Sequence, residues 1–243
     1  MSDISTKLTT IAENQQAVYE AGQKSEYDRF WDEFQQNGNR INYQYGFAGD
    51  GWKPENFKPK YPITITGTRA TNMFQSCNIN GSEQIDMTDF CSKADFSGCT
   101  NATGLFGNAR LKNITVDLSN ATTISNAFLQ GNGGGNTNIR IKISDKCKTV
   151  TAFSSSYEGQ FPCEVFIFME GSVIASSGMN MKAFTHLNKE SLTSIINALS
   201  STTSGLSVTL SKTAVNNAFE GGETGTEWNT LTGTKTNWTI TLA

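Results

Sequence analysis

A short pattern recurs along the chain after about residue 63, and this repetition constrains the fold more than any other feature. In each copy a phenylalanine follows a short polar run, and the positions are Phe74, Phe106, Phe128, Phe153 and Phe184. Phe106 and Phe128 lie 22 residues apart, and Phe128 and Phe153 lie 25 apart. Loosely related copies at a regular spacing are typical of a core and not of a unique chemical site. We therefore expect these rings to form a structural ladder.

Short alternating β segments recur in step with the phenylalanines. They occupy residues 62–66, 84–87, 113–118, 138–143 and 164–169, with centres roughly 22 to 29 residues apart. One strand, one turn and one coil that carries a phenylalanine make up each unit. This pattern predicts an α/β repeat fold, namely a leucine-rich-repeat-like solenoid over residues 63–243. The borders between units stay open over residues 129–163, where the loop LQGNGGGNTN interrupts the pattern.

The last part of the chain predicts a helix-strand cap from about residue 187. Five apolar residues share one helical face, namely Leu187, Leu192, Ile195, Ile196 and Leu199. Asn188 is a suitable N-cap for this helix, because its side chain can accept a hydrogen bond from the first turn. A strand at residues 206–210, a short helix from residue 212 and a last strand in NWTITLA are expected to follow.

Residues 1–37 predict a helix with a narrow apolar seam. Its members step by 4, 3, 4 and 3 residues, and they are Ile4, Leu8, Ile11, Gln15 and Val18. So narrow a seam does not stabilise a lone helix, so we expect an assembly or docking segment in which the polar Gln15 sets the register. The alternative is an amphipathic helix that lies on its own domain. Residues 38–62, rich in Gly, Asn, Pro and aromatic residues, are expected to form a connector.

Composition argues against several classes of function. The net charge of -3 provides no broad attraction to nucleic acid or to an anionic membrane. No apolar run is long enough to span a bilayer, and the first residues lack the apolar core of a signal peptide, so we expect synthesis in the cytoplasm and no membrane insertion. The 5 cysteines form no C-x-x-C pair and only 1 histidine is present, so we expect buried thiols, no metal and no cofactor.

No catalytic residue is expected either. His186 is the only histidine and stands outside any nucleophile motif, and the glycine-rich GNGGGN lacks the residues that follow a phosphate-binding loop. Asp86, Asp89 and Asp95 are close in sequence, but a glycosidase needs two carboxylates at a set distance across a groove. We interpret these three as exposed loop residues.

Both ends of the chain resemble known proteins. The stretch HLNKESLTSIINALSSTTSGLSVTLSKTAVNNAF resembles the C-terminal end of leucine-rich-repeat proteins from phages and prophages of gut Firmicutes, and STKLTTIAENQQAVYEAGQKSEYDRFWDEFQQNGNR resembles their N-terminal segment. The piece FSGCTN resembles the surface repeats called BspA-like.

The resemblance implies a non-enzymatic tail or baseplate protein of the virion, made in the host cytoplasm, that binds a receptor through the solenoid surface. The partners that it implies are other tail proteins, copies of the chain itself and a host surface glycan or protein. A trimer is favoured among the self-assemblies, by analogy with the symmetry of tail appendages. Two alternatives remain: a bacterial surface adhesin of the BspA-like type, which needs export, and a glycan depolymerase, which needs a carboxylate pair.

Overall fold

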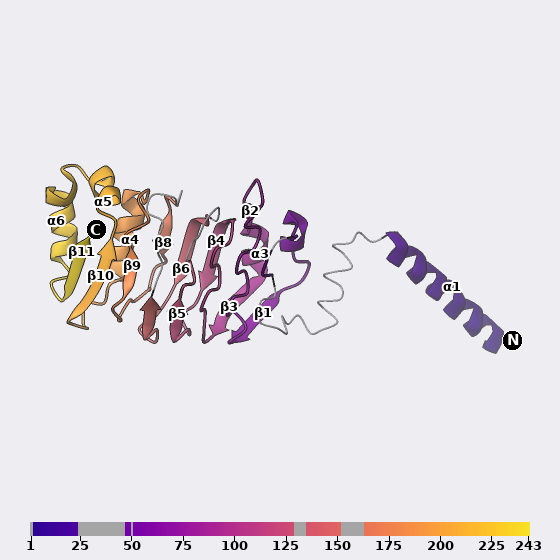
Figure 1. Ribbon diagram of the computed structural model, residues 1–243. Helices are drawn as coiled ribbons and strands as arrows, with labels where there is room; N and C mark the ends of the chain where they lie inside the picture. Colours follow the sequence, from indigo (N-terminus) through magenta and orange to yellow (C-terminus); the bar gives the residue numbers. More distant parts are fainter. Residues whose placement is uncertain (1, 24–46, 50, 129–134, 152–162) are drawn as a thin grey trace.

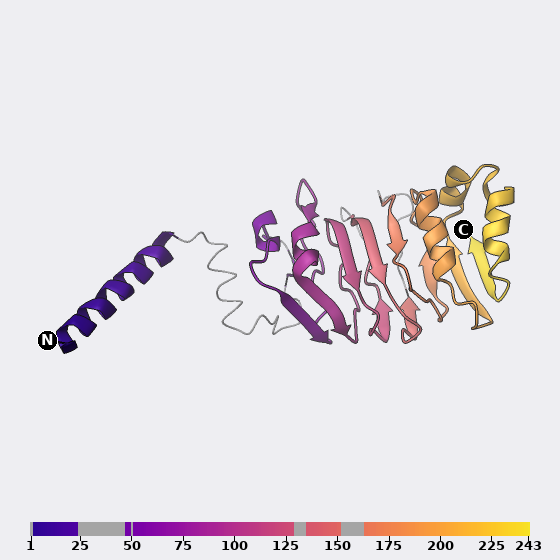
Figure 2. The same cartoon turned by 180° about the vertical axis from the view of Figure 1, so that it is seen from behind.

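The computed structural model describes residues 2–23, 47–49, 51–128, 135–151 and 163–243. Over these residues the chain is a mixed α/β protein with four short parallel sheets. Figure 1 shows the strands side by side in a row, with the C-terminal helices at one end and the N-terminal helix α1 (Ser2–Gln23) standing apart at the other. The view from behind in Figure 2 shows the same order.

The predicted leucine-rich-repeat-like solenoid is wrong. That fold requires one continuous sheet with one strand per unit, whereas the strands here divide among sheets of four, three, two and two strands. β1 (Ile63–Gly67), the expected first strand of the single sheet, pairs instead with β3 (Ala94–Cys99), where no strand was predicted. The prediction fails because several units contribute a second strand, which the repeat pattern had assigned to coil.

The four-stranded sheet has the order β2-β4-β6-β8. Its members are β2 (Ile85–Asp86), β4 (Leu111–Asp117), β6 (Thr137–Lys142) and β8 (Phe166–Phe168). The parallel register places Ile114 beside Ile139 and Ile139 beside Phe166, so buried apolar side chains line up in rows across the sheet. The alternation of buried and more exposed residues along β6, and along β4 from Ile114 onward, follows from the two-residue period of a strand.

A second set of strands runs beside this sheet. β5 (Thr123–Ser125) pairs in parallel with β7 (Thr149–Thr151), and a single bridge joins Asn101, just after β3, to Thr123. The short helix α3 (Thr88–Lys93) connects β2 to β3, and a 3-10 turn (Pro54–Phe57) precedes β1. The core therefore receives apolar residues both from the four-stranded sheet and from this second set of strands.

Four phenylalanine rings stack through the core between the strands. The rings of Phe47, Phe74, Phe106 and Phe128 follow one another with centroid separations of 5.3, 5.1 and 5.5 Å. All four side chains are buried. We call this set the phenylalanine stack. Phe47 belongs to the segment predicted as a connector, so that segment supplies the first ring of the core.

The backbone around each ring has a shared left-handed conformation. The residue two positions before the ring has a positive φ at three places, namely Asn72 (54°), Gly104 (63°) and Asn126 (53°). Asparagine and glycine tolerate this conformation better than other residues do. The amides of Asn72 and Gly104 each donate to the next turn, to Thr103 O and Ser125 O, both at 2.8 Å. Matching turns therefore hold the rings in register.

The C-terminal part forms a three-stranded sheet with helices packed beside it. Its strands are β9 (Met179–Met181), β10 (Leu206–Leu210) and β11 (Trp238–Leu242), and they lie in the order β11-β10-β9. The helices beside it are α4 (Lys189–Ala198), α5 (Lys212–Ala218) and α6 (Thr226–Gly233). A 3-10 turn at Gly222–Thr224 lies between α5 and α6. The predicted N-cap is confirmed, because the Asn188 side chain accepts a hydrogen bond from Ser191 N at 2.9 Å. The predicted bounds of the strand at 206–210 and the start of the helix at 212 are also confirmed.

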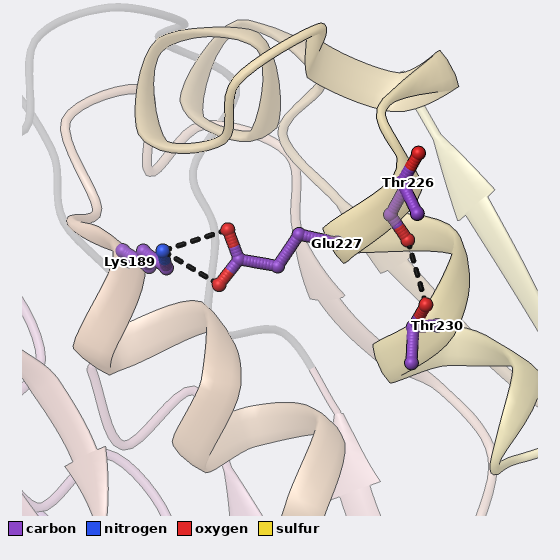
Figure 3. Close-up of polar contacts among 4 residues, drawn as sticks. All are labelled: Lys189, Thr226, Glu227 and Thr230. Atoms are coloured by element: carbon purple, nitrogen blue, oxygen red, sulfur yellow. Dashed lines mark hydrogen bonds and ion pairs between the residues drawn. The ribbon is translucent and has the colours of Figure 1, made fainter.

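An ion pair joins α4 to α6 on the surface, as Figure 3 shows. Lys189 Nζ lies 2.6 Å from Glu227 Oε1 and 2.7 Å from Oε2. The ammonium also sits 5.7 Å from the ring centroid of Phe219. Both charged side chains are 52% exposed, so solvent screening limits the pair to about 1 kcal/mol or less. The buried apolar side chains of α4 hold this part together more strongly.

Candidate functional site

The exposed apolar side chains of α1 form the first candidate site. Ile4, Leu8, Ile11 and Val18 are 65%, 61%, 53% and 74% exposed. Across the described ranges, every large hydrophobic side chain that is exposed belongs to this set. Gln15 lies in the same row and is also exposed. We call these five residues the apolar stripe, and their clustering on one helix is typical of an interaction surface.

A helix of this kind gains little stability from its own residues. The hydroxyls of Thr9 and Thr10 donate to the carbonyls of Ser5 and Thr6 within the helix, a bond that slightly destabilises a helix. In proteins most of a helix's stability comes from the packing of its apolar face and not from the intrinsic propensity of its residues. Covering one side chain of the stripe would contribute roughly 1.5–3 kcal/mol. The energetics therefore favour a partner on this face.

A polar pocket of about 460 Å³ is the second candidate site. Helix α3 and the neighbouring strands β4 and β6 provide its lining, which consists of Thr88, Cys91, Ser92, Asn113, Thr115 and Asn138. The lining combines hydroxyl, carboxamide and thiol groups, and among the described residues it contains no charged side chain. Such a surface can form hydrogen bonds in both directions with an uncharged ligand.

A chain of side-chain hydrogen bonds orients the amides at this pocket. Asn138 Nδ2 donates to Asn113 Oδ1 at 2.6 Å, and Asn113 Nδ2 donates to Asp86 Oδ2 at 2.8 Å. The other carboxylate oxygen of Asp86 accepts from Thr88 N at 2.9 Å and from Thr88 Oγ1 at 2.6 Å. Burial alone would raise the pKa of Asp86, but these hydrogen bonds and the charge of Lys112 outweigh it and hold the pKa below its usual value. The Asp86 carboxylate is therefore ionised near neutral pH, and both of its oxygens already accept hydrogen bonds.

Cys91 contributes a neutral group to the pocket. Burial raises the pKa of its thiol to about 11, although a hydrogen bond from Thr115 N at 3.5 Å opposes this shift. The thiol consequently stays protonated near neutral pH, where a nucleophilic or metal-binding cysteine needs the thiolate. All five cysteines are free thiols; Cys91 is partly buried, and the other four are buried.

The predicted ladder residues lie in the core and away from this pocket lining. Phe74, Phe106 and Phe128 stack with one another, while Phe184 meets Phe166 edge to face at 5.8 Å. Phe166 also meets Phe128 edge to face at 5.3 Å, so a ring from β8 stands between Phe128 and Phe184. Phe153 lies outside the described residues.

The residues considered for catalysis do not converge. His186 is exposed, with Nδ1 3.2 Å from the hydroxyl of its neighbour Thr185. Asp86, Asp89 and Asp95 are exposed as predicted, but the prediction that they lie in loops is wrong, because they belong to β2, α3 and β3. Asp95 accepts a hydrogen bond from Ser97 N at 2.9 Å. Over the described ranges, no group of three or more His, Cys, Asp or Glu side chains is placed to hold a metal ion. None of the helices seen in those ranges is both long and apolar enough to cross a bilayer.

Sequence reasoning missed the polar pocket, although a signal was present. Asn113 and Asn138 each stand directly before an isoleucine at the start of an alternating segment, NITVDL and NIRIKI. Two asparagines at the same place in neighbouring strands predict contact between their side chains, provided that the strands are known to be neighbours. That knowledge comes from the pairing of β4 with β6.

No family description, no characterised protein and no solved structure matches this chain to a significant degree. The function proposed for this protein therefore depends on the residues of its own chain.

Proposed function

We propose that this protein is a non-enzymatic structural component of a phage or phage-like tail or baseplate, and that the apolar stripe of α1 joins it to copies of itself. The exposure of Ile4, Leu8, Ile11 and Val18 carries the assembly part of the proposal. The resemblance of both end segments to phage and prophage proteins supports the location in the virion. The strands and the polar pocket then form the surface that meets a host glycan or protein.

Copies of the same chain are the partners that suit the stripe best. The spacing of the stripe places Leu8 and Gln15 at the first core position of a heptad, and Ile4, Ile11 and Val18 at the fourth. Leucine at the first position with isoleucine at the fourth favours assemblies of three or four helices over two. A single polar residue at the first position selects one alignment at a cost in stability. These preferences support an assembly of three or four helices, of which we propose the trimer.

Light scattering coupled to size exclusion tests the assembly. The full-length protein should have about three times the chain mass of 26.4 kDa. Leu8→Asp places a charge in the stripe and should shift the protein toward monomer. Thr10→Asp is the matched control, because Thr10 lies outside the stripe on the same helix, and it should preserve the assembly. A monomeric wild-type protein would contradict self-assembly through α1.

Mass spectrometry of purified particles tests the location. The protein should be present in particles released from the host and should remain bound to tails separated from capsids. Its absence from particles of a strain that expresses it would overturn the virion assignment. Release of reducing sugar from host polysaccharide, abolished by substituting one carboxylate, would overturn the non-enzymatic assignment.

A further inference from the structure

We propose that the polar pocket between α3, β4 and β6 binds one residue of a neutral saccharide. This inference rests on the proposed surface role of the protein and names the chemical class of its partner. The pocket, at about 460 Å³, falls within the range of small-molecule sites, which is about 300–1,000 Å³.

Two lining groups retain unused hydrogen-bonding capacity. The Thr115 hydroxyl and the Asn138 carbonyl oxygen Oδ1 have no hydrogen-bond partner among the described residues, although Thr115 N and Asn138 Nδ2 are both engaged. A hydroxyl donates and accepts, and an amide oxygen accepts. Each group can therefore pair with a hydroxyl group of a sugar ring, which can donate one hydrogen bond and accept others.

The charges around the pocket select against ionic ligands. Within the part of the chain that the structure describes, no lining side chain is ionised, since Cys91 carries a neutral thiol. The oxygens of the neighbouring Asp86 carboxylate are already occupied by Thr88 and Asn113, and the charge of Lys112 offsets that of Asp86, so neither a cation nor an anion gains an ion pair there. An uncharged polyhydroxylated ligand needs no ion pair and can bind through hydrogen bonds alone.

The backbone holds the two amides in place before any ligand arrives. Asn113 has a φ of 59° and Asn138 a φ of 50°, so both are left-handed inside neighbouring strands. Glycine adopts this conformation freely, whereas a residue with a side chain does so at a cost. The strain places both amide groups at the pocket, where the chain from Asn138 through Asn113 to Asp86 fixes their orientation.

Saturation-transfer difference NMR on the full-length protein tests this inference. The probes are the methyl glycosides of glucose, galactose and N-acetylglucosamine at millimolar concentration, with methyl glucuronide as the anionic comparison. At least one neutral glycoside should receive saturation, and the glucuronide should receive less. Thr115→Val removes the hydroxyl with little change in shape and should weaken binding about 2- to 10-fold, the loss expected for one hydrogen bond.

Two glycine substitutions separate the pocket from backbone effects. Asn138→Gly removes the amide while keeping the left-handed backbone, and it should weaken binding by a similar factor. Asn126→Gly is the control, because Asn126 is also left-handed, with a φ of 53°, but lies outside the pocket lining, and it should leave binding unchanged. Absence of saturation for every neutral glycoside, or equal signals in Thr115→Val and wild type, would overturn the proposal.

The same samples separate this inference from the proposed function. If the wild-type protein assembles but binds no glycoside, the saccharide pocket is wrong and the assembly role stands. If the protein binds a glycoside through Thr115 but is absent from particles, the pocket stands and the virion role is wrong.

Discussion

The rings of Phe74 and Phe106 stack with their centroids 5.1 Å apart and their planes within 11° of parallel. The backbone follows the same alignment, because Phe74 N donates to Leu105 O at 2.9 Å. Phe106 N continues it by donating to Ala127 O at 2.8 Å. Side-chain stacking and backbone hydrogen bonding thus support one register, so a defect at one ring affects the turns on both sides.

Replacing a central ring of the phenylalanine stack should be strongly destabilising. Phe106 is fully buried between Phe74 and Phe128, so Phe106→Ala should lower the free energy of unfolding by roughly 3–5 kcal/mol through lost burial and the cavity left behind. Urea unfolding monitored by circular dichroism measures the change. Phe106→Leu, which fills part of the volume, should cost less. Equal stability of Phe106→Ala and wild type would refute the stack as a source of stability.

Removing the N-cap of α4 should have a smaller effect. Asn188→Ala deletes the acceptor of the Ser191 N hydrogen bond and should cost about 0.5–2 kcal/mol in thermal or urea unfolding. Asn197→Ala, on the exposed side of the same helix, is the control and should stay within about 0.5 kcal/mol of wild type. Similar losses for both variants would show that the cap contributes nothing specific.

The buried thiols should make the protein less stable in alkali. Burial raises the pKa of Cys91 to about 11 and those of Cys99 and Cys163 to about 12, from an ordinary value of 9.0, and the charge of Asp95 adds to the shift at Cys99. Above about pH 9 the unfolded chain releases thiol protons that the folded chain keeps, so deprotonation favours unfolding. This contribution is complete below pH 9 and is lost as the pH rises toward 12.

Urea titrations at several pH values measure this linkage. Between pH 9 and pH 11 the wild-type free energy of unfolding should fall more steeply than that of a variant with alanine at Cys91, Cys99 and Cys163. The variant keeps every lysine and tyrosine, so the difference isolates the thiols. Parallel pH dependences in the two proteins would contradict the shifts.

The polar member of the apolar stripe should limit the stability of the assembly. Gln15→Leu would make the core of the helix assembly wholly apolar and should raise its thermal midpoint, since a polar core residue costs stability. The same change should broaden the distribution of stoichiometries, because the residue that selects one alignment is gone. Native mass spectrometry measures both the mass and its spread. A lower midpoint with a single stoichiometry would place Gln15 outside the interface.

Features that depend on neighbours a few residues away could be predicted from the amino-acid sequence alone. The spacing of the stripe predicted the helical seam of α1, Asn188 marked the start of α4, and alternation placed β10 at its observed bounds. Capping, helical periodicity and strand alternation act over about one or two turns of chain, so the residues that decide them are adjacent in the sequence.

Which strands become neighbours could not be predicted from the sequence pattern and became visible in the folded chain. Both β1 and the part of β4 from Ile114 onward alternate buried and more exposed residues, yet β1 pairs with β3 while β4 pairs with β2 and β6. Parallel pairing joins segments far apart in sequence, and an alternating strand can satisfy either sheet, so the pattern does not name the partner. The predicted single sheet failed because β3, β5 and β7 lie in segments that had been assigned to coil, and because alternation did not name the partner of β1. The pocket escaped prediction because Asn113 and Asn138 meet only once β4 and β6 lie side by side.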